Sequence, residues 1–362
     1  MRTSIAALAL AAVLPSAGGA APPPVRATTL PRTAVVGASW QAVLRAPAPP
    51  TIVASGPGTL RVKARGAGGL FRATLRFPRA GRWEIAGQLG TRTARLGTVA
   101  VDVARDPLLV DPFTIAVDDA GALLVGQRDN GPLVRVAAGR ATRVASGVGI
   151  YHVAVANGRT YVSASDGAVY RVDGAAFTRV TPPVDAGAAA VDAAGNVYVA
   201  VYAGWIKKIT SAGVVTNLAG TGVEGYAGDG GAATAAKLFH PHALALGPDG
   251  ALYVADTENR RIRRIDLRTG TIATFGGDVG ITVSVAAASD GTVWSADVRR
   301  DGTGGGITRT TAQGVTSRVA TLATANGVAV APDGTVYVNQ WESKRVGRLD
   351  PRSGMVEPVA RG

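Results

Sequence analysis

Two of the three histidines in the chain occupy equivalent places in different repeats of a β-rich pattern. His242 and Asn326 each lie eight residues before the glycine of a tight turn. His152 lies six residues before the glycine of an equivalent turn that is two residues shorter. If the repeats surround one axis, side chains at equivalent positions face a common space. Two imidazoles and an amide oxygen in that space could bind Zn²⁺, Ca²⁺ or Mg²⁺. The spacing therefore predicts a metal or ligand site formed by His152, His242 and Asn326.

The other repeats carry less reactive residues at the same place. Phe113 lies there in the first repeat, and Gly187 and Val283 occupy it in the third and fifth. An aromatic ring beside a channel offers contact surface to an organic ligand. We therefore predict four ligand-binding residues: Phe113, His152, His242 and Asn326.

Catalysis at such a site would also need groups that move protons. Asp256 and Asp297 each lie six residues after the turn glycine of their repeat, just beyond the second strand. Together with His242 they form the candidate catalytic set. Glu224 and Asp229 lie in a glycine-rich insertion and are further candidate carboxylates.

Each candidate also has a structural explanation. Asp256 and Asn259 belong to a turn in which such side chains hold the strand connection by hydrogen bonds to the backbone. Asp229 would lie near the start of a short helix over residues 232–238, where a carboxylate suits the helix N-terminus. The histidine pair could be hydrogen-bonded packing inside a channel, and strand alternation turns His240 away from that channel.

A turn followed by a β-rich strand positions these residues and recurs along the chain. The turn glycines of six such units are separated by 37, 37, 55, 41 and 43 residues. Propeller blades recur at roughly 40–50 residues, and the long interval contains the insertion at 216–240. Blades packed on both faces explain why the strands are short and apolar. The pattern predicts an all-β chain with a six-bladed β-propeller over residues 106–362.

The clearest unit extends to residue 277. Its strands are expected at 243–246, 251–255, 261–266 and 271–275. The turn Pro248-Asp249-Gly250, the segment Leu-Tyr-Val-Ala-Asp and the segment Asn-Arg-Arg-Ile-Arg-Arg-Ile resemble the NHL repeat, a propeller-blade motif. The upstream Gly-rich segment looks like a long inter-blade loop of bacterial members of that family.

Propellers of similar architecture include the virginiamycin B lyases, peptide-amidating lyases and gluconolactonase-like enzymes. These families place metal-binding His, Asn or carboxylate side chains around the channel mouth, so the resemblance implies a site there. This sequence differs from them, because it has no third channel histidine and no Glu in its first blade, where gluconolactonase-like proteins carry a metal ligand. Binding without catalysis and a metal-dependent reaction both stay open.

A basic residue recurs in the third strand of every predicted blade. The six positions are Arg135, Arg171, Lys208, Arg264, Arg309 and Arg348. This strand lies toward the rim, where Arg and Lys stems can cover neighbouring blades while the charge stays in water. We expect a structural role here rather than a ring that binds an anion.

The first part of the chain has a different organisation. A basic start, an apolar run and small residues predict a signal peptide over residues 1–21, and the apolar run is shorter than the about 20 residues of a membrane span. The proline-rich residues 22–32 are expected to form a linker. Residues 33–104 contain short strands such as the alternating segment 70–77, and they look like an immunoglobulin-like β-sandwich.

Composition limits the partners. The chain has no cysteine, which excludes disulfides and thiolate metal sites, and its net charge is +13. Basic residues do not cluster with stacking aromatics, so no specific nucleic-acid binding is expected. We expect a secreted monomer without a transmembrane span that binds an extracellular or envelope protein, a glycan or a small molecule.

Three functions follow from these features. The first is a binding module that holds a ligand or a protein at the channel face. The second is a metal-dependent lyase or lactone hydrolase that uses the histidine site at the channel mouth. The third is attachment to cell-envelope polymers through the basic charge itself.

Overall fold

The structure is a computed structural model, and it describes residues 8–10, 25–30, 33–35, 38–78, 80–89, 91–102, 106–138, 140–298, 305–322 and 324–361. The chain divides into two compact units, Met1–Ala104 and Arg105–Gly362.

The described residues of the second unit form six antiparallel four-stranded sheets, each built from strands that follow one another in the chain. The first three sheets comprise β11 (Pro112–Val117), β12 (Leu123–Gln127), β13 (Leu133–Ala137), β14 (Arg140–Ala145), β15 (Ile150–Ala156), β16 (Arg159–Ala164), β17 (Val169–Asp173), β18 (Ala176–Arg179), β19 (Ala186–Val191), β20 (Val197–Val201), β21 (Trp205–Ile209) and β22 (Val215–Ala219). The last three comprise β23 (Pro241–Leu246), β24 (Ala251–Asp256), β25 (Arg261–Asp266), β26 (Thr271–Phe275), β27 (Ile281–Ala287), β28 (Val293–Val298), β29 (Gly305–Thr310), β30 (Thr316–Leu322), β31 (Gly327–Val330), β32 (Val336–Gln340), β33 (Arg345–Leu349) and β34 (Val356–Arg361).

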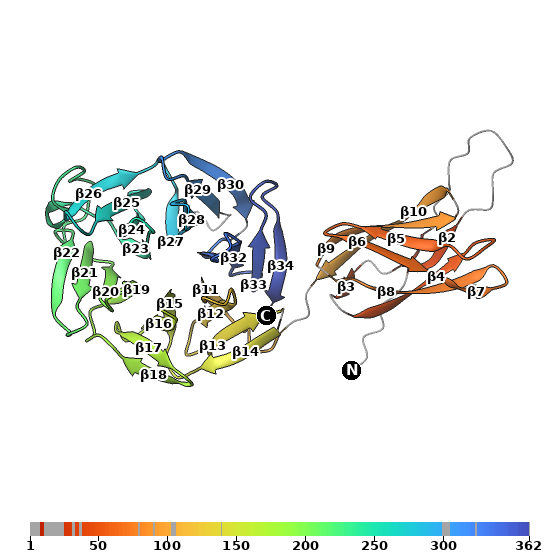
Figure 1. Cartoon of the computed structure of the whole chain (residues 1–362), viewed down its shortest axis with the longest axis horizontal. Helices are drawn as coiled ribbons and strands as arrows, with labels where there is room; N and C mark the ends of the chain where they lie inside the picture. The colour runs from red at the N-terminus through yellow and green to blue at the C-terminus, as the bar shows by residue number, and fades with distance from the viewer. Residues whose placement is uncertain are drawn as a thin grey trace. The chain divides into compact units, whose positions relative to one another are not determined.

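The six sheets surround one axis (Figure 1). The first strand of each sheet is innermost, and it contacts the first strand of the next sheet all the way around the ring, including β31 against β11. The predicted all-β propeller is confirmed. The four strands of the NHL-like unit lie at the predicted positions. β23 is two residues longer than predicted, and β24 is one residue longer.

Packing on both faces explains the composition of the blades. Every residue of β20 and of β24 is buried, and so is every residue of the alanine-rich β19. Small and β-branched side chains suit this position, because each sheet must fit between two neighbours. The apolar strands predicted from the sequence are therefore those that the ring buries.

The two ends of the ring meet without exchanging a strand, since β34 completes the last sheet by pairing with β33. The backbone N–H of Asp106 donates to the carbonyl of Arg361 at 2.7 Å. Three side chains of the last blade also donate to the first: Asn339 Nδ2 to Pro112 O (3.0 Å), Asn326 Nδ2 to Phe113 O (3.0 Å) and Trp341 Nε1 to Asp111 Oδ1 (2.7 Å). The ring is closed by hydrogen bonds at this seam.

Two of the basic residues of the third strands hold turns within their own blades. Arg264 pairs with Asp249 of the preceding turn at 2.8 Å, and the hydroxyl of Tyr253 donates to the same carboxylate at 3.1 Å. In the first blade, Arg135 pairs with Asp118 at 2.7 Å. The structural role expected for these positions fits these contacts, although the partner is a turn of the same blade rather than a neighbouring blade.

The first unit consists of two five-stranded sheets around a shared core. One has the order β1 (Leu8–Leu10), β2 (Arg26–Leu30), β4 (Ser39–Arg45), β8 (Leu70–Arg76) and β7 (Arg65–Ala67). The other has the order β3 (Thr33–Val35), β10 (Arg92–Asp102), β9 (Gly81–Leu89), β5 (Thr51–Ser55) and β6 (Thr59–Lys63). Phe71, Ala73 and Leu75 of β8 are buried as the alternation predicts, and they share the core with Trp83 and Ile85. Whether this sandwich is immunoglobulin-like stays a prediction.

Two predictions for the N-terminus fall largely outside the described residues. Of the predicted signal peptide, residues 8–10 pair with β2, and the others are not described. Within the predicted linker 22–32, residues 26–30 belong to a sheet, so this part is not a linker. In the described part of the chain, no helix is long and apolar enough to span a bilayer.

Candidate functional site

A cavity of about 410 Å³ lies at the mouth of the propeller channel. It is formed where the innermost strands begin, near the start of each blade. All six residues aligned from the sequence line it: Phe113, His152, Gly187, His242, Val283 and Asn326. Below it, a second cavity of about 200 Å³ follows the apolar inner strands, and His152 and Ser284 line both. The structure therefore brings the predicted site residues together.

His242 is held in a defined orientation at one side of the cavity. Its Nδ1 lies 3.1 Å from the carbonyl oxygen of Val283, which can only accept, so Nδ1 carries the proton. The lone pair is then on Nε2, which lies 3.4 Å from the hydroxyl of Tyr202. Burial lowers the pKa of His242, with the charge of Arg128 adding to this and the bond to Val283 opposing it. His242 is a neutral imidazole with a fixed acceptor nitrogen.

His152 is the more deeply buried of the two channel histidines. Burial lowers its pKa to about 4, and repulsion from a charged His242 contributes. Its Nδ1 is buried and has no hydrogen-bond partner among the described residues. His152 is therefore also neutral at physiological pH, and it offers an unused polar atom inside the channel.

Asn326 and Phe113 lie at the seam between the last and first blades. Because the Asn326 amide nitrogen donates to the Phe113 carbonyl, the orientation of the amide is fixed. The Phe113 ring is covered by the guanidinium of Arg128, whose Cζ lies 3.8 Å from the ring centroid. The same Cζ lies 4.9 Å from the ring of Trp341. Phe113 and Arg128 of this cation–π cluster line the cavity on the side of the seam.

Sequence reasoning missed the side chains that follow the second strand in three of the blades. Arg128, Tyr202 and Trp341 each lie seven residues after the turn glycine, one residue beyond the position used to select Asp256 and Asp297. Tyr202 and Trp341 are 41% and 37% exposed. Because strand side chains alternate, a shift of one residue separates mouth-facing from buried positions. Aligning this next position in all repeats would have revealed the aromatic and basic residues.

The predicted carboxylates do not line the cavity. Asp256 accepts hydrogen bonds from the backbone N–H of Phe239 at 2.7 Å and from Asn259 Nδ2 at 2.8 Å. Asp297 is buried and pairs with Arg318, with one contact at 3.1 Å. The structure thus separates both residues from His242, and it supports the structural explanation for Asp256 and Asn259.

The carboxylates of the insertion are also engaged elsewhere. The predicted helix over 232–238 is a single 3-10 turn, η1 (Ala233–Ala235), and it has no acidic side chain in its first turn. Glu224 lies 3.5 Å from His240 in an exposed pair. Asp229 pairs with the buried Arg263 of the NHL-like blade. His240 does not line the cavity, as alternation predicts.

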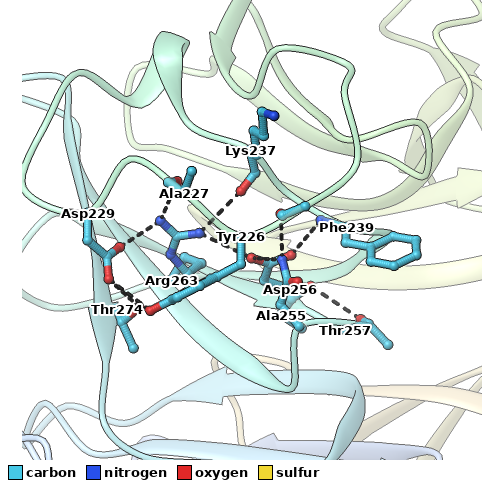
Figure 2. A network of polar contacts seen from close by, with 12 residues as sticks. Tyr226, Ala227, Asp229, Lys237, Phe239, Ala255, Asp256, Thr257, Arg263 and Thr274 are labelled. Carbon is cyan, nitrogen blue, oxygen red and sulfur yellow. Dashed lines mark hydrogen bonds and ion pairs between the residues drawn. The ribbon is translucent and has the colours of Figure 1, made fainter.

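Arg263 ties this insertion to the NHL-like blade (Figure 2). Its side chain is fully buried, and its guanidinium contacts Asp229 at 2.6 Å and Asp256 at 3.2 Å. The carbonyl oxygens of Ala227 and Lys237 accept further hydrogen bonds from it at 3.3 and 3.4 Å. Figure 2 shows Asp229 and Asp256 on either side of the guanidinium, so both carboxylates serve the fold.

The donor set is incomplete for a resident metal. Zinc sites use at least three His, Cys or carboxylate ligands, and calcium or magnesium sites use mainly oxygens. In the described ranges no group of three or more His, Cys, Asp or Glu is placed to hold an ion. His152, His242 and Asn326 alone do not fit such a group, so the predicted metal site lacks a third strong ligand.

Comparisons with known proteins agree with this architecture. Residues 240–265 match the NHL repeat family. A stretch of 70 residues is 40% identical to teneurin-1 from Mus musculus; it covers 17% of this chain and 3% of teneurin-1. The match therefore spans a small fraction of that relative.

Solved structures resemble the chain over greater lengths. Virginiamycin B lyase from Staphylococcus aureus is 18% identical with a TM-score of 0.50, over 70% of this chain and 85% of that one. A protein of unknown function from Bacteroides thetaiotaomicron is 15% identical with a TM-score of 0.53, over 90% of this chain and 97% of that one. At these identities the likeness shows the fold. The chain is a β-propeller protein that contains an NHL repeat.

Proposed function

We propose that this protein binds a small organic ligand in the cavity at the channel mouth. The observation that carries the proposal is the lining of that cavity, in which aromatic rings stand beside a few fixed polar groups. Phe113, Tyr151 and Tyr202 offer ring surface, and Asn326 and His242 offer polar atoms of defined orientation. A volume of about 410 Å³ falls in the range of small-molecule sites, roughly 300–1,000 Å³.

A thermal-shift screen of small organic compounds tests this proposal. Compounds that bind should raise the Tm of the wild-type protein, since a ligand at a hundred times its Kd adds about 2.7 kcal/mol of stability. We expect these shifts to disappear in Tyr202→Ala and His242→Ala. The control is His240→Ala, because His240 is exposed and lies outside the cavity. Shifts that persist in both cavity variants would place binding elsewhere and refute the proposal.

A second candidate function is proton transfer to His242 from the bound ligand or from water, as in a lyase or a lactone hydrolase. It is favoured by the fixed tautomer, which leaves Nε2 as an acceptor facing the cavity. The lowered pKa keeps this nitrogen unprotonated near neutral pH, as a general base requires. Virginiamycin B lyase shares the fold, but the metal-dependent form of this proposal lacks a third strong ligand here.

A panel of lactones and other cyclic esters tests this second function, with product formation measured by mass spectrometry. His242→Ala should lower turnover by at least about a hundredfold if the imidazole is the base. His240→Ala should retain activity. Equal turnover in the two variants would exclude His242 as the base.

Envelope attachment through basic charge stays a proposal of its own. It rests on the net charge of +13. Several of these cations, such as Arg135 and Arg264, are paired with turn carboxylates and are less available to a polymer. The cavity therefore supports small-ligand binding better than the net charge supports attachment.

A further inference from the structure

Arg128 has an unusual environment for an arginine of this protein. It follows β12 directly, is half-buried and lines the cavity. Its guanidinium carbon lies 3.8 Å from the ring centroid of Phe113 and 4.9 Å from that of Trp341. Trp341 is itself fixed, because its indole N–H donates to Asp111 at 2.7 Å. The aromatic neighbours thus hold the cation at the edge of the cavity.

No acceptor within the described residues uses the N–H groups of Arg128. Its guanidinium forms neither a hydrogen bond nor an ion pair there, and the carboxylate of Asp129, which follows it and lines the same cavity, is not within ion-pair distance. Arg135 of the same blade and Arg264 of the NHL-like blade do have carboxylate partners, at 2.7 and 2.8 Å. Arg128 is therefore held by rings while its donors stay available.

This arrangement suits a carboxylate. A guanidinium offers parallel N–H donors that match the two oxygens of a carboxylate, and such bidentate pairs are among the stronger hydrogen bonds in proteins. Partial removal from water strengthens the attraction. Stacking on aromatic rings fixes the guanidinium plane in advance, so less conformational entropy is lost when the ligand binds.

Apart from the carboxylate of Asp129, the described side chains that line the cavity carry no charge that would compete for that anion or repel it. His152 and His242 are neutral at physiological pH, because burial lowers the pKa of each. Arg128, Tyr202 and His242 all line this cavity, so the three side chains face a common space. A ligand that reaches Arg128 with one end can therefore reach Tyr202 and His242 with the other.

We infer that the cavity takes a small organic carboxylate, whose charged group pairs with Arg128 and whose body lies against Phe113, Tyr151 and Tyr202. This inference rests on the proposed function and names the ligand class of the same site. Because Trp341 belongs to the last blade and Arg128 to the first, the bound anion would also lie beside the seam that closes the ring.

Matched pairs of compounds test the inference on the full-length protein. The probes are phenylacetate with phenylacetamide, indole-3-acetate with its amide, and glucuronate with glucuronamide, titrated calorimetrically at low ionic strength. We expect at least one carboxylate to bind at least tenfold more tightly than its amide. Arg128→Met should abolish this preference. Arg128→Lys should retain part of it, because lysine keeps the positive charge but lacks the parallel N–H donors of the guanidinium.

Arg143→Met is the matched control. Arg143 is an exposed residue of the outer strand β14 in the same blade, and its replacement removes one positive charge at a distance from the cavity. It should leave the preference for carboxylates unchanged. Unfolding curves of each variant show whether the propeller is intact.

The outcomes separate this inference from the proposed function. If neutral compounds bind in a manner that depends on His242 and Tyr202 but not on Arg128, the cavity is a ligand site and the carboxylate assignment is wrong. If every carboxylate binds no better than its amide, or if the preference survives in Arg128→Met, the assignment is likewise overturned. If neither charged nor neutral compounds bind, both proposals fail.

Discussion

Replacing Arg263 with methionine should destabilise the propeller by about 3–5 kcal/mol, because the change leaves buried carboxylate charge without its partner. Asp256 is fully buried and would lose its ion pair, and Asp229 would lose the contact that ties the insertion to the blade. Methionine retains a long apolar stem, so little packing volume is lost. Urea unfolding, followed through the propeller transition, measures the difference in free energy.

Arg264→Met is the control for this experiment. Arg264 is the next residue in β25 and also pairs with a carboxylate, Asp249, but both side chains are about one-third exposed. Pairs of this kind contribute about 0–1 kcal/mol. A comparable loss in the two variants would mean that burial of the Arg263 cluster is not what stabilises the insertion.

Lowering the pH from about 6.5 to about 4 should cost the protein about 3 kcal/mol of stability through His152 alone. The pKa of His152 is about 4 in the fold and 6.5 when unfolded. Above pH 6.5 both states are neutral and the full stability is present. As the pH falls, the unfolded chain takes up the proton first, so stability declines until the folded state also titrates near pH 4.

Unfolding free energies of wild-type protein and His152→Phe, measured at several pH values, isolate this contribution. Other titrating groups are common to both proteins and cancel in the difference. The difference should shift by about 3 kcal/mol in favour of the variant between pH 6.5 and 4. His240→Gln, which alters an exposed histidine, should follow the wild type. A pH-independent difference for His152→Phe would show that the imidazole is not buried as described.

Most of the propeller could be predicted from the sequence because its signals are local. The turn glycines and the strand after each of them recur at blade intervals, and in the NHL-like unit β25 and β26 lie at the predicted residues. Counting back from each turn glycine was enough to place His152 and His242 at one cavity. Equivalent positions in blades around one axis must converge.

The rest of the site depended on information that the spacing does not contain. Asp256 and Asp297 lie six residues after the turn glycines of their blades, at a position that the strand turns away from the cavity. Arg128 and Tyr202 lie seven residues after the turn glycines of two other blades, and they line the cavity. Which of two successive residues faces the mouth is set by how the strand ends, and a shift of one residue exchanges the faces. A consistent test would compare both positions across all blades.

Closure of the ring could not be predicted either. The fourth strand of the last blade comes from the C-terminal segment, but the seam is held by side chains far apart in sequence. Asn339 and Pro112, for example, meet only after the ring has formed. Such contacts depend on tertiary structure and leave no periodic signal.

A crystal structure with the compound that gives the largest thermal shift tests the central claim most directly. The account predicts that this compound occupies the cavity between Phe113, Tyr202 and His242, with a carboxylate, where it has one, against Arg128. A compound bound at any other surface, with the channel mouth left to solvent, would contradict the claim that this cavity is the ligand site.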